Sequence, residues 1–414
     1  MLGMTTWQSA WLVLLIILAG GLVFSKLTER PRIPDVAAYL LLGIIIGPSV
    51  LNWVSEPSQS QVNQLILNLG ATLILFGGGR SVRFSVLKQV WISVTMLATV
   101  GVVVSTVVVG VAAHWLLGIP WLESLLLSGL LSSTDPATLI PIFSRVPILP
   151  RLQQTVESES AFNDATAAVL VYTLLGLLQH HGDFHLFQPI GDFFHSALLG
   201  LAIGLIFGWL SLLLLSDRGI PVFHEYASVF LLLVALGSYE CAQLLNASGM
   251  MATFTAGMIA GNGKAIRLPL SNHTEHNVHH FENALTLIMR ILIFTLLGTQ
   301  VNFVLIQRYW LLGLATIAVL MLVARPMTVL ASVLFDRRAK WRWREILFMF
   351  WVRETGVIPA ALSGMLLSKG VPYAPMISSI TFIAILLTIL LQASTTSILA
   401  RKLGVSIEFL REDI

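Results

Sequence analysis

The sequence predicts an all-α membrane protein with about thirteen transmembrane helices. Of its 414 residues, 56% are hydrophobic and 11% are charged, whereas soluble domains carry about 25% charged residues. The mean hydropathy is +0.85, and apolar runs of about 20 residues, the length that crosses a bilayer, recur along the chain. A water-soluble globule is therefore not expected. The pI of about 9.1 is attributed to basic loops and needs no nucleic-acid partner.

The predicted spans follow one another without a linker or a soluble domain. The first has no Lys or Arg before its apolar stretch and no small-residue cleavage site, which predicts a retained helix and not a signal peptide. About 15 residues follow the last span, so we expect residues 1–414 to form a single membrane domain without a soluble regulatory domain. The spans lie near residues 7–25, 36–54, 61–79, 89–116, 121–143, 154–179, 193–215, 222–245, 248–262, 281–300, 309–335, 346–367 and 375–399.

Lys and Arg residues are distributed very unevenly between alternate predicted loops. One set of loops holds two, Arg308 and Lys369. Because cytoplasmic loops carry the excess of basic residues, we expect a cell (inner) membrane protein with its N-terminus outside and its C-terminus in the cytoplasm. The other set holds nineteen: Lys26, Arg30, Arg32, Arg80, Arg83, Lys88, Arg145, Arg151, Arg218, Lys264, Arg267, Arg337, Arg338, Lys340, Arg342, Arg344, Arg401, Lys402 and Arg411.

Three further arginines, Arg290, Arg325 and Arg353, fall inside predicted spans. An unpaired arginine within a bilayer costs several kcal/mol. We therefore expect each to pair with an acidic residue of another span.

The fifth span contains the segment SSTDPATLIP, in which two prolines follow a carboxylate. Pro136 and Pro141 each remove a backbone donor and interrupt the helix, and such a break is tolerated in a membrane only against a cavity or other helices. We expect Asp135 and the hydroxyl residues before it, including Thr134, to line a polar gap near the bilayer midplane. The alternative is a simple proline kink with a hydrogen-bonded aspartate.

The sixth span contains SESAFNDATAAVL, whose polar residues fall on two neighbouring stripes of a helix. Glu159 and Asn163 stand at i and i+4, so Glu159 is placed to pair with an arginine of a neighbouring helix, with Asn163 bridging. Ser160 and Asp164 share the other stripe with Glu157. We expect Asp164 to face the cavity as a carboxylate without a cationic partner from the protein.

A carboxylate of this kind can exchange a proton for a cation. Carboxylate, hydroxyl and carbonyl oxygens suit hard alkali cations better than soft metals, and the single cysteine, Cys241, excludes a multi-thiolate site. The alternative is that both carboxylates of the sixth span only stabilise the helix.

The twelfth span, FMFWVRETGVIPAALSG, is interrupted in the same way by Arg353, Glu354, Gly356 and Pro359. Two spans broken by Gly or Pro in separate halves of a chain indicate crossed helices from an inverted repeat. The corresponding units would be spans four to six and eleven to thirteen. Arg353 and the positive half-helix ends would then compensate Asp135.

Four segments carry a family resemblance: TDPATLIP at 134–141, SESAFNDATAAV at 158–169, LLLGIIIGP at 40–48 and FENALTLIMRILIFTLLGTQ at 281–300. They resemble the NhaP-type sodium/proton antiporters of the cation:proton antiporter superfamily. The resemblance implies a homodimer in which a core domain, including residues 89–179 and 309–399, moves against an interface domain built largely from the remaining helices.

The resemblance also implies roles for single residues. Asp164 would carry the ion and the proton, with Asp135, Ser160 and the carbonyl of Thr134 as nearby Na⁺ ligands. Of the supporting residues, Glu159, Asn163 and Arg325 would form a structural ion-pair network, and Arg353 would fill the family's arginine position in span twelve.

Two departures from the family pattern concern charge. Gly77 in LILFGGGRSVRF stands where the third span usually has an acidic residue, and Glu354 stands where span twelve usually has glycine. The first removes a ligand or gate carboxylate, and the second adds a charge beside Arg353. Both bear on ion selectivity and pH dependence.

These observations predict a secondary antiporter that exchanges Na⁺ or Li⁺ for H⁺ one for one, without net charge movement, because asparagine beside Asp164 carries no charge. The protein is not expected to be an enzyme or to need a cofactor; its partners would be monovalent cations, protons and the lipid bilayer. K⁺/H⁺ exchange by the same mechanism is the nearest alternative. An intramembrane hydrolase, a non-transporting sensor and proton-coupled uptake of an organic solute are the others.

Histidines cluster in the segment HTEHNVHH before span ten, at positions 273, 276, 279 and 280. An unperturbed imidazole titrates near pH 6.5, so they are candidates for pH sensing or metal binding. A solvated loop is the preferred interpretation here and for His180, His181 and His185.

Overall fold

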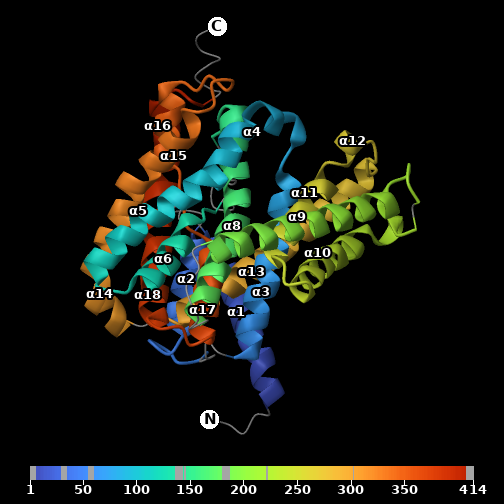
Figure 1. The fold of residues 1–414 in the computed structure, drawn as a ribbon. Coiled ribbons are helices and arrows are strands. Elements are labelled where there is room, and N and C mark those ends of the chain that lie inside the picture. Colours follow the sequence, from blue (N-terminus) through green and yellow to red (C-terminus); the bar gives the residue numbers. More distant parts are fainter. Residues whose placement is uncertain are drawn as a thin grey trace.

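A computed structural model describes residues 6–28, 35–54, 60–135, 143, 146–179, 187–220, 222–301 and 303–406. Nearly all of this part of the chain is helical (Figure 1). Its N-terminal half contains α1 (Thr6–Thr28), α2 (Asp35–Ile46), α3 (Gln61–Ser81), α4 (Phe84–Ala98), α5 (Val100–Leu117), α6 (Trp121–Ser132), α8 (Pro150–Gln179) and α9 (Phe187–Leu215). The other half contains η1 (His224–Tyr226), α10 (Ala227–Leu244), α11 (Gly249–Gly261), α12 (Gly263–Ile266), α13 (Asn272–Thr299), α14 (Phe303–Val319), the π-helix η2 (Leu320–Ala324), α15 (Arg325–Val333), α16 (Trp343–Trp351), α17 (Val357–Ser368), α18 (Ala374–Leu387), the π-helix η3 (Thr388–Ala393) and α19 (Ser394–Lys402).

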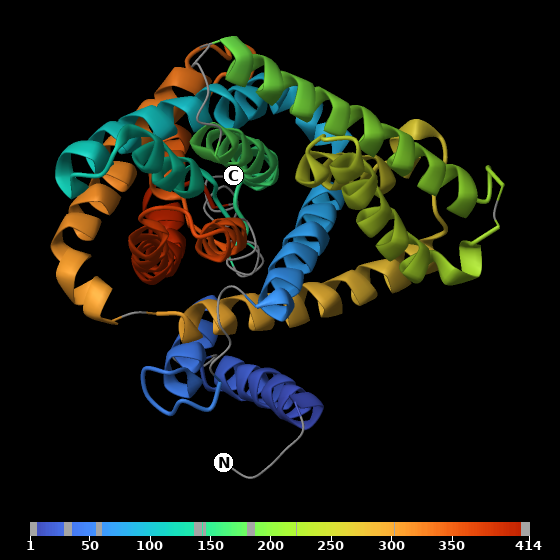
Figure 2. The ribbon, with the colours of Figure 1, turned by 60° about the horizontal axis from the view of Figure 1, so that its bottom comes forward.

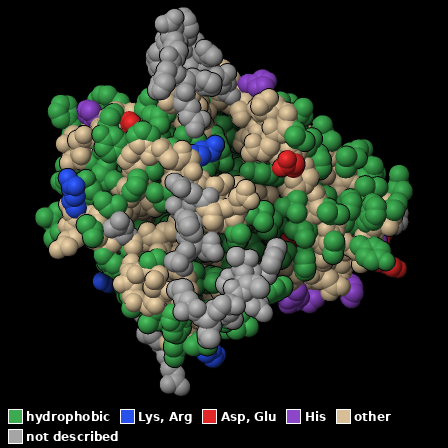
Figure 3. Space-filling view, turned by 90° about the horizontal axis from the view of Figure 1, so that it is seen from below, with side chains coloured by type: hydrophobic (Ala, Val, Ile, Leu, Met, Phe, Trp, Pro, Cys, Tyr) green, Lys and Arg blue, Asp and Glu red, His purple; other side chains and the backbone are tan. Residues whose placement is uncertain are grey.

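The predicted all-α membrane architecture is confirmed. Within the described residues, eight helical stretches are long and apolar enough to cross a membrane, and five shorter apolar helices accompany them. Each lies within or across one of the thirteen predicted spans. Figure 1 shows the C-terminus and α16 at one end of the molecule and the N-terminus at the other. On the N-terminal end, hydrophobic side chains dominate and Lys and Arg are sparse (Figure 3).

Several boundaries differ from the prediction. The second helix ends at Ile46, because the chain turns at Gly47 and Pro48. The long fourth span consists of two helices, α4 and α5, that meet at Thr99. Helix α13 begins at Asn272, where Ser271 caps it by accepting a hydrogen bond from the Thr274 amide. The histidine-rich segment is therefore helical, and the loop interpretation was wrong for it; His180, His181 and His185 lie outside the described residues.

Two groups of helices pack against each other. One contains α4, α5, α6 and α8 together with α14 to α19, and the other contains α1, α2 and α3 together with α9, α10, α11 and α13. Figure 2 shows the first group on the left and the helices from α9 to α11 on the right, with α3 between them. The groups meet where α3 and α13 contact α17, and where α8 contacts α3, α9 and α11.

Small residues allow α3 and α11 to approach closely beside this junction. A Cβ atom at Gly79 would lie 2.2 Å from the Phe254 carbonyl oxygen, and one at Gly257 would lie 2.2 Å from the Phe76 carbonyl oxygen. Such backbone contact is typical of helix packing in membranes. There the hydrophobic effect does not drive helices together, and small residues allow the close van der Waals packing that does. It fixes α3 as one wall of the cavity described below.

Candidate cation and proton site

Two extended segments cross near the middle of the first helix group. Helix α6 ends at Ser132 and the chain continues in extended conformation through Asp135, while Val352–Gly356 separates α16 from α17. The Asp135 amide donates a hydrogen bond of 2.8 Å to the Glu354 carbonyl oxygen. The predicted break of the twelfth span is present at Arg353, Glu354 and Gly356, whereas Pro359, also expected to interrupt the span, lies in the first turn of α17. In the fifth span the helix ends before Asp135, and Pro136 and Pro141 lie outside the described residues.

Gly356 makes this crossing possible. A Cβ atom there would lie 2.0 to 2.3 Å from side-chain atoms of Asp135. We expect Gly356→Ala to lower the free energy of unfolding by about 3 kcal/mol or more, at or above the upper end of the usual overpacking range. Asp135 cannot easily move away from the new Cβ atom, because its amide is hydrogen-bonded to Glu354. Thermal unfolding and transport should both show the loss. Gly176→Ala in α8, where a Cβ meets nothing within 4 Å, is the control and should be neutral or slightly stabilising; equal behaviour of the two variants would contradict the account.

The two arginines nearest the crossing each bind the C-terminal end of a half-helix. Arg353 donates from Nη2 to the Leu131 carbonyl oxygen of α6 at 2.6 Å and to Ser105 Oγ at 3.3 Å. Arg325 donates to the carbonyl oxygens of Met349 at 2.8 Å and Val352 at 3.0 Å at the end of α16. These carbonyls lack intrahelical partners and carry the negative end of the helix dipole. The two arginines therefore balance the partial negative charge at the C-terminal ends of α6 and α16.

Arg325 also pairs with Glu159 of α8. Its Nη2 lies 3.0 Å from Glu159 Oε2, and Nη1 contacts Oε1. Both side chains are 2–3% exposed, so the pair is shielded from solvent. One ion pair thus connects α8, α15 and α16.

The expectation that every buried arginine pairs with an acid was wrong for two of the three. Arg353 binds a carbonyl and a hydroxyl oxygen, and no ion pair is found for it or for the half-buried Arg290 within the described part of the chain. Backbone carbonyls, which carry no signature in the sequence, took the place of the expected carboxylate at Arg353.

Asn163 connects α8 to the extended segment after α6. It accepts a hydrogen bond of 3.2 Å from the Thr134 amide and donates one of 2.9 Å to Thr134 Oγ1. Ser160 Oγ lies 2.8 Å from the same Thr134 hydroxyl. The expected bridging of the Glu159–Arg325 pair by Asn163 is therefore not seen among the hydrogen bonds of the described residues. Asn163 instead holds Thr134 in register with α8.

Asp164 lies beside this contact and is 6% exposed. Ser133 Oγ donates a short hydrogen bond to its Oδ1, and Asp135 is close enough to interact with it electrostatically. Within the described residues no arginine, lysine or histidine pairs with Asp164. The sequence placed Ser133 among the hydroxyl residues expected to line the polar gap, but it was not assigned to the cation site and its contact with Asp164 was not predicted.

A cavity of about 670 Å³ leads to both aspartates. Asp135 and Asp164 line it together with Glu157, Gly77 and residues of one polar face of α13. Water and ions can therefore reach the two carboxylates from this side. The α13 residues along the wall are Asn272, Glu275, His276, His279, Glu282, Asn283 and Thr286.

An ion pair joins α3 and α13 in the wall of this cavity. Arg80 Nη1 of α3 lies 2.5 Å from Glu282 Oε2 of α13, with side chains 9% and 19% exposed. Near it, a Cβ atom at Gly77 would meet only Thr286 Oγ1, at 4.0 Å. Arg80 was assigned to a loop from the sequence and Glu282 received no role. Their pairing depends on how α3 and α13 pack, which the sequence pattern alone does not give.

Crossed half-helices around buried, solvent-reachable carboxylates are the arrangement of a secondary transporter of small ions. The comparison with known sequences agrees with this class. The profile of the family described as "Sodium/hydrogen exchanger, transmembrane" matches residues 12–402, and the chain belongs to that family.

Individual relatives extend the likeness over almost the whole chain. The sequence is 29% identical over 399 residues to the K⁺/H⁺ antiporter NhaP of Alkalimonas amylolytica, covering 96% of this chain and 67% of that protein. It is 29% identical to Na⁺/H⁺ antiporter 1 of Methanocaldococcus jannaschii, covering 94% of each. The structure of the sodium proton antiporter MjNhaP1 from the same organism at pH 8 superposes with a TM-score of 0.83 at 28% identity, covering 96% of this chain and 99% of that one.

Proposed function

We propose that the protein exchanges Na⁺ or Li⁺ for H⁺ across the membrane by alternating access, and that Asp164 carries both ions in turn. The observation that carries this proposal is the environment of Asp164. It is a buried carboxylate at the end of an open cavity, bound by a serine hydroxyl and not by a cation of the protein. A buried carboxylate in this position needs either a proton or a cation for charge balance.

The surrounding oxygens suit an alkali cation. Ser133, Thr134, Ser160 and Asp135 bring hydroxyl, carbonyl and carboxylate oxygens to the same region, which are the ligands preferred by hard cations. We assign Asp164, Asp135, Ser160 and the Thr134 carbonyl to the cation site. The hydroxyl of Ser133, bound to Asp164 here, would reorient its proton when a cation replaces the proton on that carboxylate.

The supporting residues hold this site on a rigid unit. Asn163 binds α8 to the Thr134 segment, the Glu159–Arg325 pair binds α8 to α15 and α16, and Arg353 binds the α16–α17 break to α6. We propose that this group, the core domain of residues 89–179 and 309–399, moves as a body against the remaining helices. Its movement would expose Asp164 to the two sides of the membrane alternately.

The stoichiometry follows from the number of carriers. Asn163 has no charge, and Asp164 would hold either one proton or one cation, so each cycle moves no net charge. We expect no steady current from reconstituted protein under a Na⁺ gradient in a lipid-bilayer recording. A current that reverses with the Na⁺ gradient would contradict one-for-one exchange.

K⁺/H⁺ exchange is a second candidate because Gly77 leaves the part of the cavity wall formed by α3 without a carboxylate. The open space at this position accepts a longer side chain. We expect Gly77→Glu to fold normally and to raise the apparent affinity for Na⁺ over K⁺ severalfold, since an added carboxylate favours the smaller cation. Competition between the two cations in a proton-flux assay measures the ratio, with Gly77→Gln as the uncharged control. An unchanged ratio would remove Gly77 from the selectivity argument.

The cellular setting is proposed on the same basis. The multiple apolar helices make this an integral membrane protein. The uneven distribution of basic residues supports a cell membrane location with the N-terminus outside and the C-terminus in the cytoplasm. We also expect a homodimer, which mass measurement of the purified protein in detergent would test.

The experiment that tests the exchange itself uses liposomes with an imposed pH gradient and a pH-sensitive dye. Na⁺, Li⁺ and K⁺ are added in turn to vesicles that contain the purified protein. Collapse of the gradient by Na⁺ and Li⁺ is expected. Collapse by K⁺ alone would transfer the assignment to K⁺/H⁺ exchange, and no response to any of the three from folded protein would refute the proposal.

A further inference from the structure

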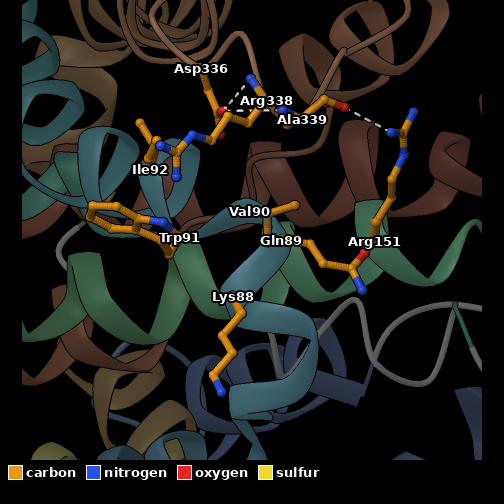
Figure 4. Close-up of a pocket in the computed structure, with 9 residues that line it drawn as sticks. All are labelled: Lys88, Gln89, Val90, Trp91, Ile92, Arg151, Asp336, Arg338 and Ala339. Carbon is orange, nitrogen blue, oxygen red and sulfur yellow. Dashed lines mark hydrogen bonds between the residues drawn. The ribbon is translucent and has the colours of Figure 1, made fainter.

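A second pocket lies at the end of the molecule that carries the C-terminus, and it shares no lining residue with the cavity that leads to Asp164. Its volume is about 340 Å³, and it is bounded by the first turns of α4, the start of α8 and the loop between α15 and α16 (Figure 4). Its basic lining residues are Lys88, Arg151 and Arg338. Figure 4 shows Arg338 extending from the loop across α4 toward Ile92.

Buried polar contacts fix the loop that forms one wall. Asp336 Oδ2 accepts hydrogen bonds from the Ser93 amide at 3.1 Å and the Ser93 hydroxyl at 2.6 Å. Its Oδ1 accepts from the amides of Arg338 and Ala339, both at 3.1 Å. Asp336 lines the pocket but is only 3% exposed, and both oxygens of its carboxylate are engaged by the hydrogen bonds that hold the loop on α4.

Arg151, the second basic residue of the pocket wall, also holds the loop in place. It donates to the Ala339 carbonyl oxygen at 2.9 Å and pairs with Glu345 at 2.6 Å, and its guanidinium lies 5.2 Å from the centre of the Trp341 ring. Because Glu345 is 1% exposed, this ion pair compensates both charges inside the protein. The loop therefore stands at a fixed position relative to α4 and α8.

The remaining two basic residues of the pocket are uncompensated. Lys88 and Arg338 are exposed, and neither forms an ion pair within the described part of the chain. The loop between α15 and α16 and the end of α19 carry further exposed basic residues without an ion pair in the described part of the chain: Arg337, Lys340, Arg342, Arg344, Arg401 and Lys402. The neighbouring exposed apolar side chains are Trp91, Leu334, Phe335 and Trp343.

We propose that this pocket binds the phosphate headgroup of an anionic phospholipid from the surrounding bilayer, with Arg338 and Lys88 as the phosphate-binding residues. The Lys88 side chain points away from Arg338 in Figure 4, and this exposed, flexible side chain would turn toward the phosphate when the lipid binds. Four or more basic residues next to the end of a transmembrane helix attract anionic lipids, and exposed tryptophans beside them occur at the membrane interface.

The proposed position of the loop on the cytoplasmic side is enough to explain its basic residues. It does not explain the pocket, or the contacts of the buried Asp336 and Glu345 that hold the loop in place. A lipid fits better than free phosphate because Trp91 and Phe335 offer apolar surface to acyl chains.

The bound lipid would join elements that also carry the transport site. Helix α8 holds Asp164, and the loop at the pocket connects α15, which holds Arg325, to α16. A headgroup that contacts both α4 and this loop would stabilise the helix group as a whole. The expected result is a higher unfolding temperature in the presence of anionic lipid, whatever cation the protein transports.

The test uses the purified full-length protein in neutral detergent. Thermal unfolding is recorded while phosphatidylglycerol, phosphatidylcholine or inorganic phosphate is titrated. Phosphatidylglycerol should raise the unfolding temperature, and the other two should not. The double variant K88E/R338E should need more than about thirtyfold more phosphatidylglycerol for the same shift, because the loss of two basic residues alone gives that factor and the variant also adds two acidic residues. Its control, R308E/K369E, changes charge equally at Arg308 of α14 and at Lys369 after α17, away from this pocket, and should respond like the unmodified protein.

Each outcome decides the proposal. An unaltered lipid response of K88E/R338E would overturn it, and an equal shift by inorganic phosphate would assign the site to free phosphate. The residues are exposed and unpaired, so the variant should unfold at the unmodified temperature when no lipid is present. Should the charge reversal prevent folding, K88Q/R338Q provides the same comparison, with a smaller loss of lipid affinity expected.

Discussion

Asp164→Asn is expected to reduce cation-driven proton exchange to the level of protein-free liposomes. Asparagine has nearly the same shape and can still accept the hydrogen bond from Ser133, but it can neither bind a proton at this position nor carry the charge that attracts a cation. The variant should therefore fold normally, because it removes a buried charge that has no cationic partner in the protein. Dye-reported collapse of a pH gradient in liposomes measures the loss.

Glu157→Gln is the matched control for this experiment. Glu157 lies on the same helix, lines the same cavity and accepts a hydrogen bond of 2.8 Å from Gln153, but it takes no part in the hydrogen bonds found among Thr134, Ser160 and Asn163 of the described residues. Its neutralisation should leave most of the exchange activity. If Glu157→Gln were as inactive as Asp164→Asn, the charge of the whole cavity, and not one carrier carboxylate, would drive the exchange.

Arg325→Ala is expected to lower the free energy of unfolding by about 3–5 kcal/mol, the range for breaking a buried ion pair from one side. The substitution leaves the Glu159 carboxylate buried without its partner and frees the carbonyl oxygens of Met349 and Val352 at the end of α16. Thermal unfolding in detergent should show a large decrease in the midpoint, accompanied by poor yield. Transport should fall with the folded fraction.

Two comparisons separate the ion pair from a general effect of losing an arginine. The double variant Glu159→Gln/Arg325→Met removes both charges and should recover part of the stability, because no unpaired charge remains. Arg308→Ala, an exposed residue, should leave the midpoint unchanged. A double variant no more stable than Arg325→Ala alone would show that the loss comes from the hydrogen bonds to α16, which both variants lack, and not from the unpaired charge of Glu159.

The architecture and the carrier helix could be predicted because their signals are local in the sequence. Apolar length gave the spans, the segment around Gly356 gave the break in the twelfth span, and i, i+4 spacing placed Glu159 on a face that meets Arg325. Asp164 was singled out because a carboxylate within an apolar membrane helix is energetically costly and therefore indicates a functional site.

The contacts across the crossing could not be predicted in the same way. Ser133 meets Asp164, and Asn163 meets Thr134, only because one extended segment lies against α8 at a particular register. Arg353 binds the carbonyl of Leu131, which is a backbone group common to every residue. Such partners are determined by tertiary packing and are not encoded in residue type.

The start of α13 could have been found from the sequence. Ser271 is a residue type that caps helices, and the polar residues after it recur at helical spacing through Glu275, His279 and Glu282 to Thr286. The polar composition of the segment favoured a loop instead. In the structure the same residues form the polar wall of the cavity, so the spacing was the better signal than the composition.

Proton release on cation binding is the most direct test of the claim that Asp164 holds a proton and a cation in turn. Purified protein in weakly buffered detergent solution is mixed with Na⁺, Li⁺ or K⁺, a pH-sensitive dye records the protons set free, and calorimetry counts the bound cations. The account predicts one proton released for each cation bound, and no release from Asp164→Asn. Cation binding without proton release, or equal release from the variant, would contradict it.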